Sequence, residues 1–377
     1  MKGVIHIMKF ICDKSDLLAG VNIVLKAVPV RTTMPVLECI LIDTTLLGIK
    51  LMTNDMEIGI ETTVKGEIAD GGIVAVDAKI FSEIVRRLPD GPVTIETDNS
   101  LTMFITCGKA KFIISGRTGD DFPEFPVLER NECLTISQFS LREVIKQTIF
   151  SISDNDSNQI MKGILMDVNR SRLQVVSLDG HRVSVRNIEL RDEYEPKKAI
   201  VPGKTLNEIS KILSGGIEDF VSIFITESNI VFEFDDTVVV SRIIDGEFFN
   251  ISHLLSINSD TRIRINKKLL MDSMDRCLLL IRENDKKPVI LQITDSEMKL
   301  KLTTGLGTMN EEIEIEKIGN DLTIAFNPKF VLDALKAIDD ETVDIYMSTA
   351  KTPCFIKDVD ETYIYLILPV NFNSMSV

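Results

Sequence analysis

The sequence predicts an α+β protein built from three copies of one module. One helix-forming stretch occurs three times, with its first lysine at Lys79, Lys204 and Lys329, so that successive copies are 125 residues apart. Alternating apolar and polar segments surround each copy, as in strands of antiparallel sheets that carry helices on one face. At roughly 100–200 residues per domain, 377 residues allow two to four domains, and the repeat selects three.

The repeated stretch is an amphipathic helix that holds two cations on its outer face. Its copies read DAKIFSEIVRRLPDG at 77–91, GKTLNEISKILSGG at 203–216 and NPKFVLDALKAIDD at 327–340. Seven residues return a helix to nearly the same face, because each residue turns by about 100°. The aligned pairs are therefore Lys79 with Arg86, Lys204 with Lys211, and Lys329 with Lys336.

A solvated face on an ordinary surface helix is the alternative interpretation of each cation pair. An acid also follows each first lysine by four residues (Glu83, Glu208, Asp333), which supports the helix and leaves about one net positive charge per copy. Three copies in register make the solvated-face interpretation less favourable than a shared binding role.

Each repeat shows the same order of elements, namely an early amphipathic helix, three strands, the lysine helix and further strands. The early helices are expected at Ser15–Val28, Ser140–Ile152 and Lys267–Ile281. The strands that follow them are expected at Leu37–Thr44, Ile49–Thr53, Glu57–Val64, Gly163–Val168, Leu173–Ser177, Arg182–Leu190, Val289–Thr294, Met298–Thr303 and Met309–Glu316. The strands after the lysine helices are expected at Val93–Thr97, Thr102–Cys107, Lys111–Ser115, Val221–Thr226, Asn229–Phe234, Val238–Ile243, Thr342–Tyr346, Thr352–Lys357 and Thr362–Leu368.

Two connecting segments divide the repeats. They read FPVLERN at 125–131 and SHLLSINSDT at 252–261, and they predict domains over residues 1–131, 132–257 and 258–377.

Composition limits the classes of function. A net charge of −15 argues against a generally adhesive nucleic-acid binder, so any DNA-binding cations must be concentrated on one surface. The six cysteines form no CxxC pair, which predicts neither a zinc site nor a disulfide framework and favours a reducing compartment, the cytoplasm. No apolar run approaches 18 residues, so no membrane span is predicted.

Signatures of catalysis, metal binding and cofactor binding are weak. Three histidines, of which His6 lies near the start, are few for a triad or a metal centre, and no GxxxxGK[ST] occurs. The acidic stretch 154–158 begins like a calcium loop, but Gln159 stands where that loop needs glycine. Asp235 and Asp236 are better explained as a hairpin turn than as a metal pair. We therefore predict no catalytic residue, no metal and no cofactor.

Eight stretches, in the right order along the chain, resemble the β subunit of bacterial DNA polymerase III, the replicative sliding clamp. They are Met8–Phe10, Arg31–Leu37, Asp121–Pro123, Asp179–Arg182, Ile200–Pro202, Asp245–Gly246, Phe326–Asn327 and Leu368–Pro369. The resemblance covers essentially residues 8–372. It implies the DNA clamp fold, in which three repeated domains place helices inside a ring and antiparallel sheets outside.

The resemblance also implies partners. A head-to-tail homodimer would enclose double-stranded DNA without reading its sequence, tether the replicative DNA polymerase and confer processivity. The implied DNA-binding residues are the six helix cations together with Arg31, Asn155 and Gln159 in two loops. The dimer interface would bring Phe112 and Ile114 of one copy to Leu280 and Ile281 of the other.

A hydrophobic pocket between domains II and III is implied as well, and it accepts short motifs of the replicative polymerase, the clamp loader and repair polymerases. By position its lining is Met161, Leu178, Gly180, His181, Arg182, Val183, Phe249, His253, Leu254, Leu366, Ile367, Leu368, Pro369, Val370 and Phe372. Phe249 stands where the family commonly has proline, and His253 stands where it commonly has a basic residue. These departures affect the preferred motif.

Two other functions stay open at the level of sequence. One is a metal-dependent nuclease that uses carboxylate pairs, for which the sequence offers no spaced acidic cluster with a helper residue. The other is an adaptor that binds proteins and never encircles DNA.

Overall fold

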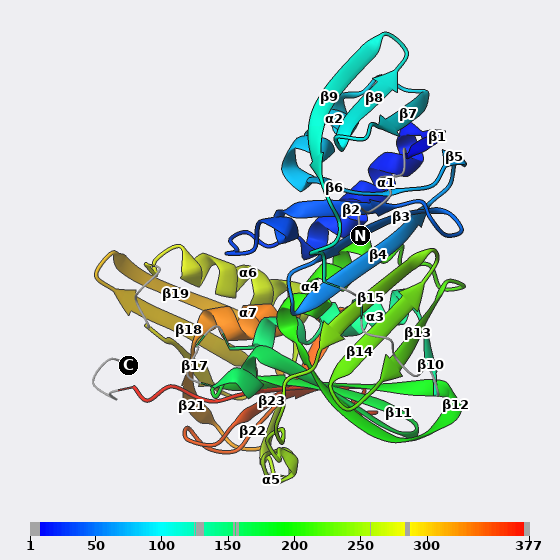
Figure 1. Ribbon diagram of the computed structural model, residues 1–377. Coiled ribbons are helices and arrows are strands. Elements are labelled where there is room, and N and C mark those ends of the chain that lie inside the picture. Colours follow the sequence, from blue (N-terminus) through cyan, green and yellow to red (C-terminus); the bar gives the residue numbers. More distant parts are fainter. Residues whose placement is uncertain are drawn as a thin grey trace. The chain divides into compact units, whose positions relative to one another are not determined.

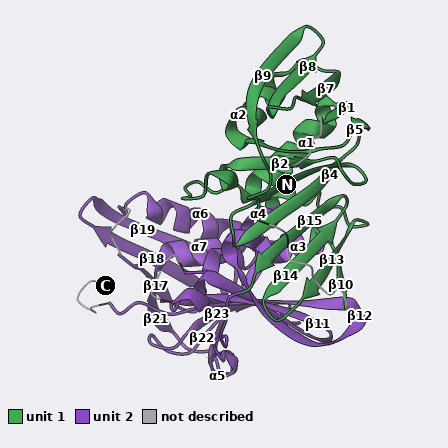
Figure 2. Ribbon diagram, in the orientation of Figure 1, with its two compact units in different colours: residues 1–139, 211–243 green, residues 140–210, 244–377 purple. Residues whose placement is uncertain are grey.

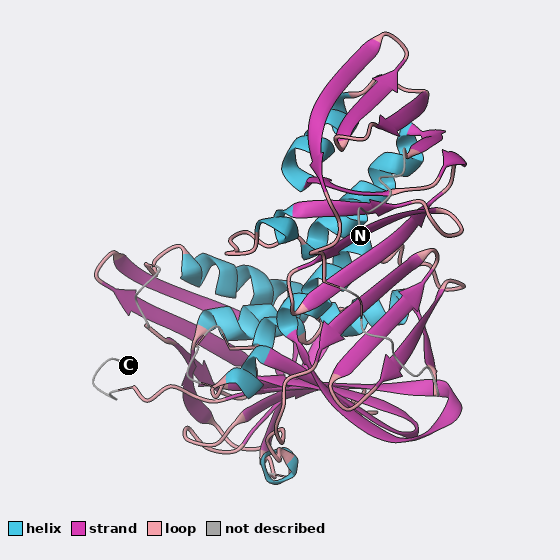
Figure 3. Ribbon diagram, viewed as in Figure 1, coloured by secondary structure: helices cyan, strands magenta, loops and turns pink. Residues whose placement is uncertain are grey.

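The computed structural model describes residues 8–123, 125, 132–153, 155, 158–256, 258–282 and 287–372. Helices and antiparallel strands alternate along these residues, as Figure 1 shows by sequence and Figure 3 by element type. The α+β class predicted from periodicity is confirmed.

The chain forms two compact units, which do not follow the three sequence repeats (Figure 2). Unit 1 contains residues 1–139 and 211–243, and unit 2 contains residues 140–210 and 244–377. The middle repeat is therefore divided, because its strands pair with strands of both neighbouring repeats.

Among the described residues of unit 1, thirteen strands form one sheet in the order β10-β13-β14-β15-β4-β3-β2-β6-β9-β8-β7-β1-β5. The strands are β1 (Lys9–Asp13), β2 (Cys39–Asp43), β3 (Ile49–Asn54), β4 (Ile58–Val64), β5 (Glu67–Asp70), β6 (Ile73–Asp77), β7 (Pro92–Thr97), β8 (Thr102–Cys107), β9 (Ala110–Arg117), β10 (Leu134–Ser137), β13 (Phe220–Ile225), β14 (Asn229–Phe234) and β15 (Thr237–Arg242). Strand β15 pairs with β4, with Thr237 opposite Thr62, and this pairing joins the first two repeats.

Two helices contact each other and the first-repeat strands of unit 1. They are α1 (Lys14–Val24), followed by the 3₁₀ turn η1 (Leu25–Ala27), and α2 (Ala78–Arg87). Asp77 caps α2 by accepting a 2.7 Å hydrogen bond from the Ile80 N–H. A second 3₁₀ turn, η2 (Pro35–Glu38), precedes β2.

Unit 2 contains a sheet of seven described strands in the order β11-β12-β24-β23-β22-β16-β20 and one of four in the order β19-β18-β17-β21. The first has β11 (Gly163–Leu178), β12 (Arg182–Pro202), β16 (Thr261–Asn266), β20 (Glu316–Ile318), β22 (Thr342–Met347), β23 (Cys354–Lys357) and β24 (Tyr363–Ile367). The second has β17 (Val289–Ile293), β18 (Glu297–Thr304), β19 (Gly307–Glu314) and β21 (Leu322–Phe326).

Helices α6 (Lys267–Leu278) and α7 (Pro328–Lys336) pack together over one core of unit 2. Asn266 and Asn327 cap them by accepting 3.0 Å hydrogen bonds from the N–H groups of Leu269 and Lys329. The remaining helical elements are α3 (Gln138–Lys146), η3 (Ile149–Ser151), η4 (Gln159–Lys162), α4 (Gly203–Ile212) and α5 (Ser252–Leu255).

Several element predictions need correction. The segments 163–168 and 173–177 form one strand, because β12 stays beside β11 past an irregular register around Arg170, whose φ is +53°. Leu37 lies in η2 rather than in a strand. Seven short strands were missed, namely β1, β5, β6, β10, β16, β20 and β21. Most of these lead directly into a helix, so no turn residue marks their end.

Candidate DNA-binding and partner-binding sites

Helix α2 presents its two predicted cations to solvent. Lys79 and Arg86 are exposed, whereas Phe81 and Val85 are fully buried. Glu83 accepts an ion pair of 2.5 Å from Arg86 and one of 2.9 Å from Arg87, so the acid of this helix is neutralised by its own arginines. The amphipathic arrangement predicted for this copy is confirmed.

Helix α4 repeats the arrangement. Lys204 and Lys211 are exposed, and Leu206 and Ile209 are buried. The helix begins at Gly203, where a Cβ would collide with Ile152 Cδ1 and stand 3.1 Å from the Lys162 carbonyl oxygen, so a larger residue would displace the Ile152 side chain.

Helix α7 also exposes its cations and buries its apolar face, but its acid, Asp333, pairs with a residue outside the helix. Lys329 and Lys336 are exposed, and Leu335 is buried. Asp333 turns to Arg182 of β12, and its Oδ2 atom lies 2.8 Å from the arginine Nη1. The three helices therefore match in their cations, and α2 and α7 differ in how the intervening acid is paired.

The predicted loop residues are also exposed. Arg31 lies between η1 and η2, Asn155 lies between η3 and η4, and Gln159 is the first residue of η4. The Asn155 N–H donates a 3.1 Å hydrogen bond to the Ser153 hydroxyl. DNA binding by these residues and by the helix cations stays a prediction.

Five residues of the predicted peptide pocket lie on one face of the seven-stranded sheet, namely Met161, Leu178, Val183, Leu366 and Leu368. That face carries an apolar cluster made by Val176, Leu178, Val183, Val185, Ile251, Phe355, Ile364 and Leu366, with Met161, Leu165, Phe248, Leu255, Tyr346 and Leu368 packed on it. Because side chains alternate along β24, Tyr363, Tyr365 and Ile367 point to the opposite face and join the core beneath α6 and α7. The Ile367 side chain thus lies on the opposite face from the five predicted pocket residues of the apolar cluster.

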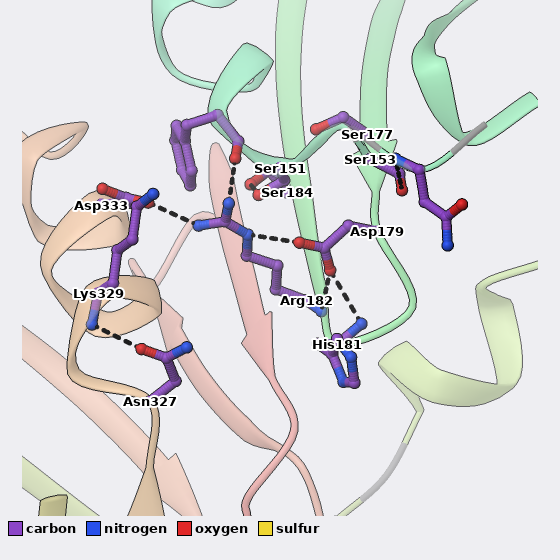
Figure 4. A network of polar contacts seen from close by, with 12 residues as sticks. Ser151, Ser153, Ser177, Asp179, His181, Arg182, Ser184, Asn327, Lys329 and Asp333 are labelled. Atoms are coloured by element: carbon purple, nitrogen blue, oxygen red, sulfur yellow. Dashed lines mark hydrogen bonds and ion pairs between the residues drawn. The ribbon is translucent and has the colours of Figure 1, made fainter. Parts of the chain in front are cut away.

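The turn between β11 and β12 supplies the polar part of this candidate site (Figure 4). The Asp179 carboxylate accepts hydrogen bonds from the N–H groups of His181, at 2.9 Å, and Arg182, at 3.1 Å. Gly180 between them has φ of +87°, a left-handed conformation that favours glycine. The His181 carbonyl accepts a 2.8 Å hydrogen bond from the Leu368 N–H, which brings the turn to the end of β24.

The segment past Leu368 continues to the edge of the four-stranded sheet. The Val370 N–H donates a 2.8 Å hydrogen bond to the carbonyl of Ala325 in β21. Pro369 between them has no N–H to donate, which ends the regular pairing of β24. Phe372 is half-buried near the end of the described chain.

The segment 248–255 borders the same cluster. Phe248, Ile251 and Leu255 pack on it, while Phe249 is 39% exposed and Leu254 is 38% exposed. His253 is also exposed. The resemblance pointed to Phe249, His253 and Leu254 in this segment. It missed Phe248, Ile251 and Leu255, which pack on the cluster, because an irregular segment has no periodicity that identifies its buried side.

The sheets of the described residues end at β5, β10, β11, β19, β20 and β21, and β9 is also paired on only one side for most of its length. Strand β9 pairs with β8 along its length but with β6 only at Gly116 and Arg117, and β19 pairs only with β18. Phe112 and Ile114 of β9 lie opposite buried Ile105 and Met103, so they share the helix-covered face. The edges of β9 and β19 carry or adjoin the predicted interface residues.

Leu280 and Ile281 follow α6 and pack against the core of unit 2. The Leu280 Cδ2 atom lies 3.8 Å from where a Cβ of Gly307, the first residue of β19, would stand. One half of the predicted dimer interface therefore lies beside one edge strand, and the other half lies on the second.

The residues that the structure describes bear on three further features, namely metal binding, membrane spanning and thiol reactivity. No three His, Cys, Asp or Glu side chains there are arranged to hold a metal, and no described helix is long and apolar enough to cross a membrane. Burial raises the pKa of the Cys12 and Cys277 thiols to about 12, and because the thiolate is the reactive form these cysteines are poor nucleophiles.

Comparison with known proteins accounts for this combination of three repeats and cationic helices. Residues 8–126, 135–250 and 252–371 match the N-terminal, central and C-terminal domains of the DNA polymerase III beta subunit. The chain belongs to the DNA polymerase III beta subunit family. It has the three-domain clamp fold, as the sequence predicted. The predicted boundaries at 131 and 257 lie outside the described residues and stay predictions.

Individual family members are similar over nearly the whole chain. The Beta sliding clamp of Bacillus subtilis is 34% identical, over 96% of this chain and 99% of its own length. A solved structure from Eubacterium rectale, described as a DNA polymerase III beta subunit, is 58% identical with a TM-score of 0.94 over 97% of this chain and all of its own. The Bacillus subtilis clamp structure is 33% identical with the same TM-score and coverage.

Proposed function

We propose that two copies of the chain close into a ring around duplex DNA and hold the replicative polymerase on it. The observation that carries this proposal is the presence, in a chain with the clamp fold, of three equivalent helices with exposed cation pairs and buried apolar faces. Relatives are named sliding clamps, which are processivity factors rather than enzymes.

The charge pattern fits a ring that slides. Phosphate contacts from Lys79, Lys204, Lys329 and their partners are independent of base sequence and weaken with salt. Arg31, Asn155 and Gln159 add contacts from loops. Enclosure keeps the protein on DNA, so each contact stays weak enough for movement, and the remaining negative charge of the chain repels DNA from other surfaces.

The test replaces Lys79, Lys204 and Lys329 together with glutamate and measures retention on nicked circular DNA after loading. We expect retention and polymerase processivity to fall while the dimer mass is unchanged. A matched triple variant, Lys65→Glu, Arg242→Glu and Lys351→Glu, makes the same change in charge at exposed positions outside the helices. Equal retention by the two variants would contradict the assignment of the DNA face.

In this proposal, ring closure uses the backbone edges of β9 and β19. In this proposal β9 of one copy pairs with β19 of the other in a head-to-tail contact, which two copies satisfy twice. Phe112 and Ile114 then meet Leu280 and Ile281 on the helix-covered side of both sheets. A homodimer that persists at low concentration is required.

Partner proteins bind, in this proposal, at the apolar cluster beside the Asp179–Arg182 turn. The partners are the replicative polymerase, the clamp loader and repair polymerases, each through a short motif with apolar side chains. We expect Leu368→Asp, which places a charge on the cluster, to abolish capture of the polymerase, and deletion of residues 368–377 to do the same with the ring intact. The matched control is Val359→Asp, at a position that is 79% exposed.

Two assays separate this function from its alternatives. A nuclease would degrade DNA in the presence of Mg²⁺, whereas we expect no cleavage. An adaptor that never encircles DNA would be indifferent to topology, whereas we expect retention on closed circles and release when the circle is cut. Such a role places the protein with the chromosome in the cytoplasm, without a membrane partner.

A further inference from the structure

We infer that Arg182 is a positioning residue, which fixes the Asp179–Arg182 turn of the proposed peptide site to helix α7 and does not itself contact the peptide. The inference rests on the proposed function, in which this turn borders the peptide. By resemblance alone Arg182 was placed in the pocket lining, and the structure gives its side chain a different use.

Each nitrogen of the Arg182 guanidinium group donates a hydrogen bond within the protein. Arg182 is only 9% exposed. Its Nε donates to Asp179 Oδ2 at 3.0 Å, its Nη1 donates to Asp333 Oδ2 at 2.8 Å, and its Nη2 donates to the Phe150 carbonyl. All three nitrogens of the planar group therefore have acceptors on different elements, as the close view shows (Figure 4).

Two aromatic rings complete the enclosure. The central carbon of the guanidinium lies 4.4 Å from the centre of the Phe330 ring and 5.5 Å from that of Phe150. Phe330 belongs to α7 and also stacks on His181, with ring centres 6.1 Å apart. The cation is therefore surrounded by rings and acceptors, which leaves little of it for an external ligand.

The conformation of the Asp179–Arg182 turn depends on the contacts of the Arg182 side chain. Asp179 holds the Arg182 side chain with one carboxylate oxygen and the N–H groups of His181 and Arg182 with the other. A Cβ at Gly180 would meet nothing within 4 Å, so the tip of the turn has no packing of its own. The bonds run from α7 through Arg182 and Asp179 to His181, whose carbonyl then holds Leu368.

Asp333 is the residue that tests positioning, because in this structure it reaches the turn only through Arg182. We propose Asp333→Asn, which keeps the size of the side chain and removes its charge. The probe is a fluorescein-labelled peptide carrying the clamp-binding motif of the cell's replicative polymerase. Its dissociation constant is measured by fluorescence anisotropy with the full-length dimer.

We expect the peptide to bind Asp333→Asn about tenfold more weakly, through faster dissociation, with dimer mass and DNA retention unchanged. Amide exchange should increase at Gly180 and His181 and stay unchanged in the middle of α7. Asp333→Glu retains the charge and should recover part of the affinity. The matched control is Glu83→Gln, which removes the corresponding acid of α2 and should leave peptide binding unchanged.

A second variant, Arg182→Lys, keeps the charge but cannot satisfy three acceptors at once, and it should weaken peptide binding similarly. If Arg182→Lys weakens binding and Asp333→Asn does not, Arg182 contacts the peptide directly and the inference is wrong. Unchanged affinity in both variants also overturns it. Failure of the unaltered protein to bind the peptide would instead refute the proposed peptide site.

Discussion

Two of the edge strands, β9 in unit 1 and β19 in unit 2, differ in charge and in the contacts of their side chains. Strand β9 reads AKFIISGR and contains no acid, whereas β19 reads GTMNEEIE and contains no base. Strand β19 contacts α6 through Glu311, whose carboxylate accepts hydrogen bonds of 2.5 and 2.8 Å from Arg276 and one of 2.6 Å from Ser273. Strand β9 presents exposed Phe112 and Ile113 instead.

The difference in charge is what the proposed head-to-tail dimer needs. Two β9 edges would repel each other through their cations, and two β19 edges would repel through their carboxylates. A basic edge and an acidic edge attract, so the proposed contact joins different surfaces of the two copies. In the proposed dimer two such contacts close a ring, and the first two predictions below test this pairing.

The largest expected effect follows from a charge on the apolar side of β9. Ile114→Asp should weaken the proposed dimer by roughly 100-fold, about 3 kcal/mol, because a carboxylate would be buried against Leu280 and Ile281 without a partner. Sedimentation equilibrium at low protein concentration measures the change. Ile113→Asp, on the opposite face of the strand, is the control and should dimerise nearly normally.

A change of charge sign should have an intermediate effect. Lys111→Glu or Glu314→Lys alone is expected to weaken the dimer about tenfold, because each places like charges across the proposed contact. The two variants mixed with each other, or combined in one chain, should recover much of the affinity. Additive losses in the combined variant would show that the two edges do not meet.

The smallest expected effect is a pH dependence of thermal stability that arises from Glu311 of β19. The hydrogen bonds from Arg276 lower the pKa of Glu311 below its ordinary value near 4.5. A carboxyl group with a lowered folded-state pKa stabilises the fold above its unfolded pKa, and the stabilisation is lost as pH falls through the lowered value. The thermal midpoint of the unaltered protein should therefore exceed that of Glu311→Gln by a few degrees at pH 7, and the gap should narrow as pH falls below the ordinary pKa of the carboxyl group.

Thermal unfolding of both proteins from pH 7 to pH 3 measures the gap. The Lys111→Gln variant of β9, where no carboxylate is present, should follow the pH dependence of the unaltered protein. A gap between the unaltered protein and Glu311→Gln that is as wide at pH 3 as at pH 7 would rule out the stabilising role of the Arg276 contact.

The sequence was informative wherever one chemical pattern repeats within a single element. Helices α2, α4 and α7 bury Phe81, Ile209 and Leu335 and expose their cations as predicted, because a period of 3.6 residues assigns each position to a face. Most strands that lie between turns were found for the same reason. Strands leading directly into helices were missed, since caps such as Asp77 belong to the following helix.

The candidate peptide site was only partly predictable. Resemblance identified Leu178, Val183, Leu366 and Leu368 of the apolar cluster, but it also included Ile367, which the pleat of β24 turns to the other face. It placed Arg182 among the lining residues, although its charge is held by acceptors 32 and 151 positions away in the chain. A local pattern contains no information about such distant partners.

The sequence by itself determined that three similar modules exist, which face of each helix is buried, and which class of family the chain resembles, because these depend on spacing within a few turns of chain. Only the tertiary structure decided that the middle repeat is divided between two compact units. It also decided that Asp333 forms an ion pair with Arg182 of a distant strand, whereas Glu83 pairs with arginines of its own helix. The reason is that strand pairings such as β15 with β4 and β12 with β24 bring together residues more than a hundred positions apart. Which of several chemically similar partners a side chain meets is fixed by that packing.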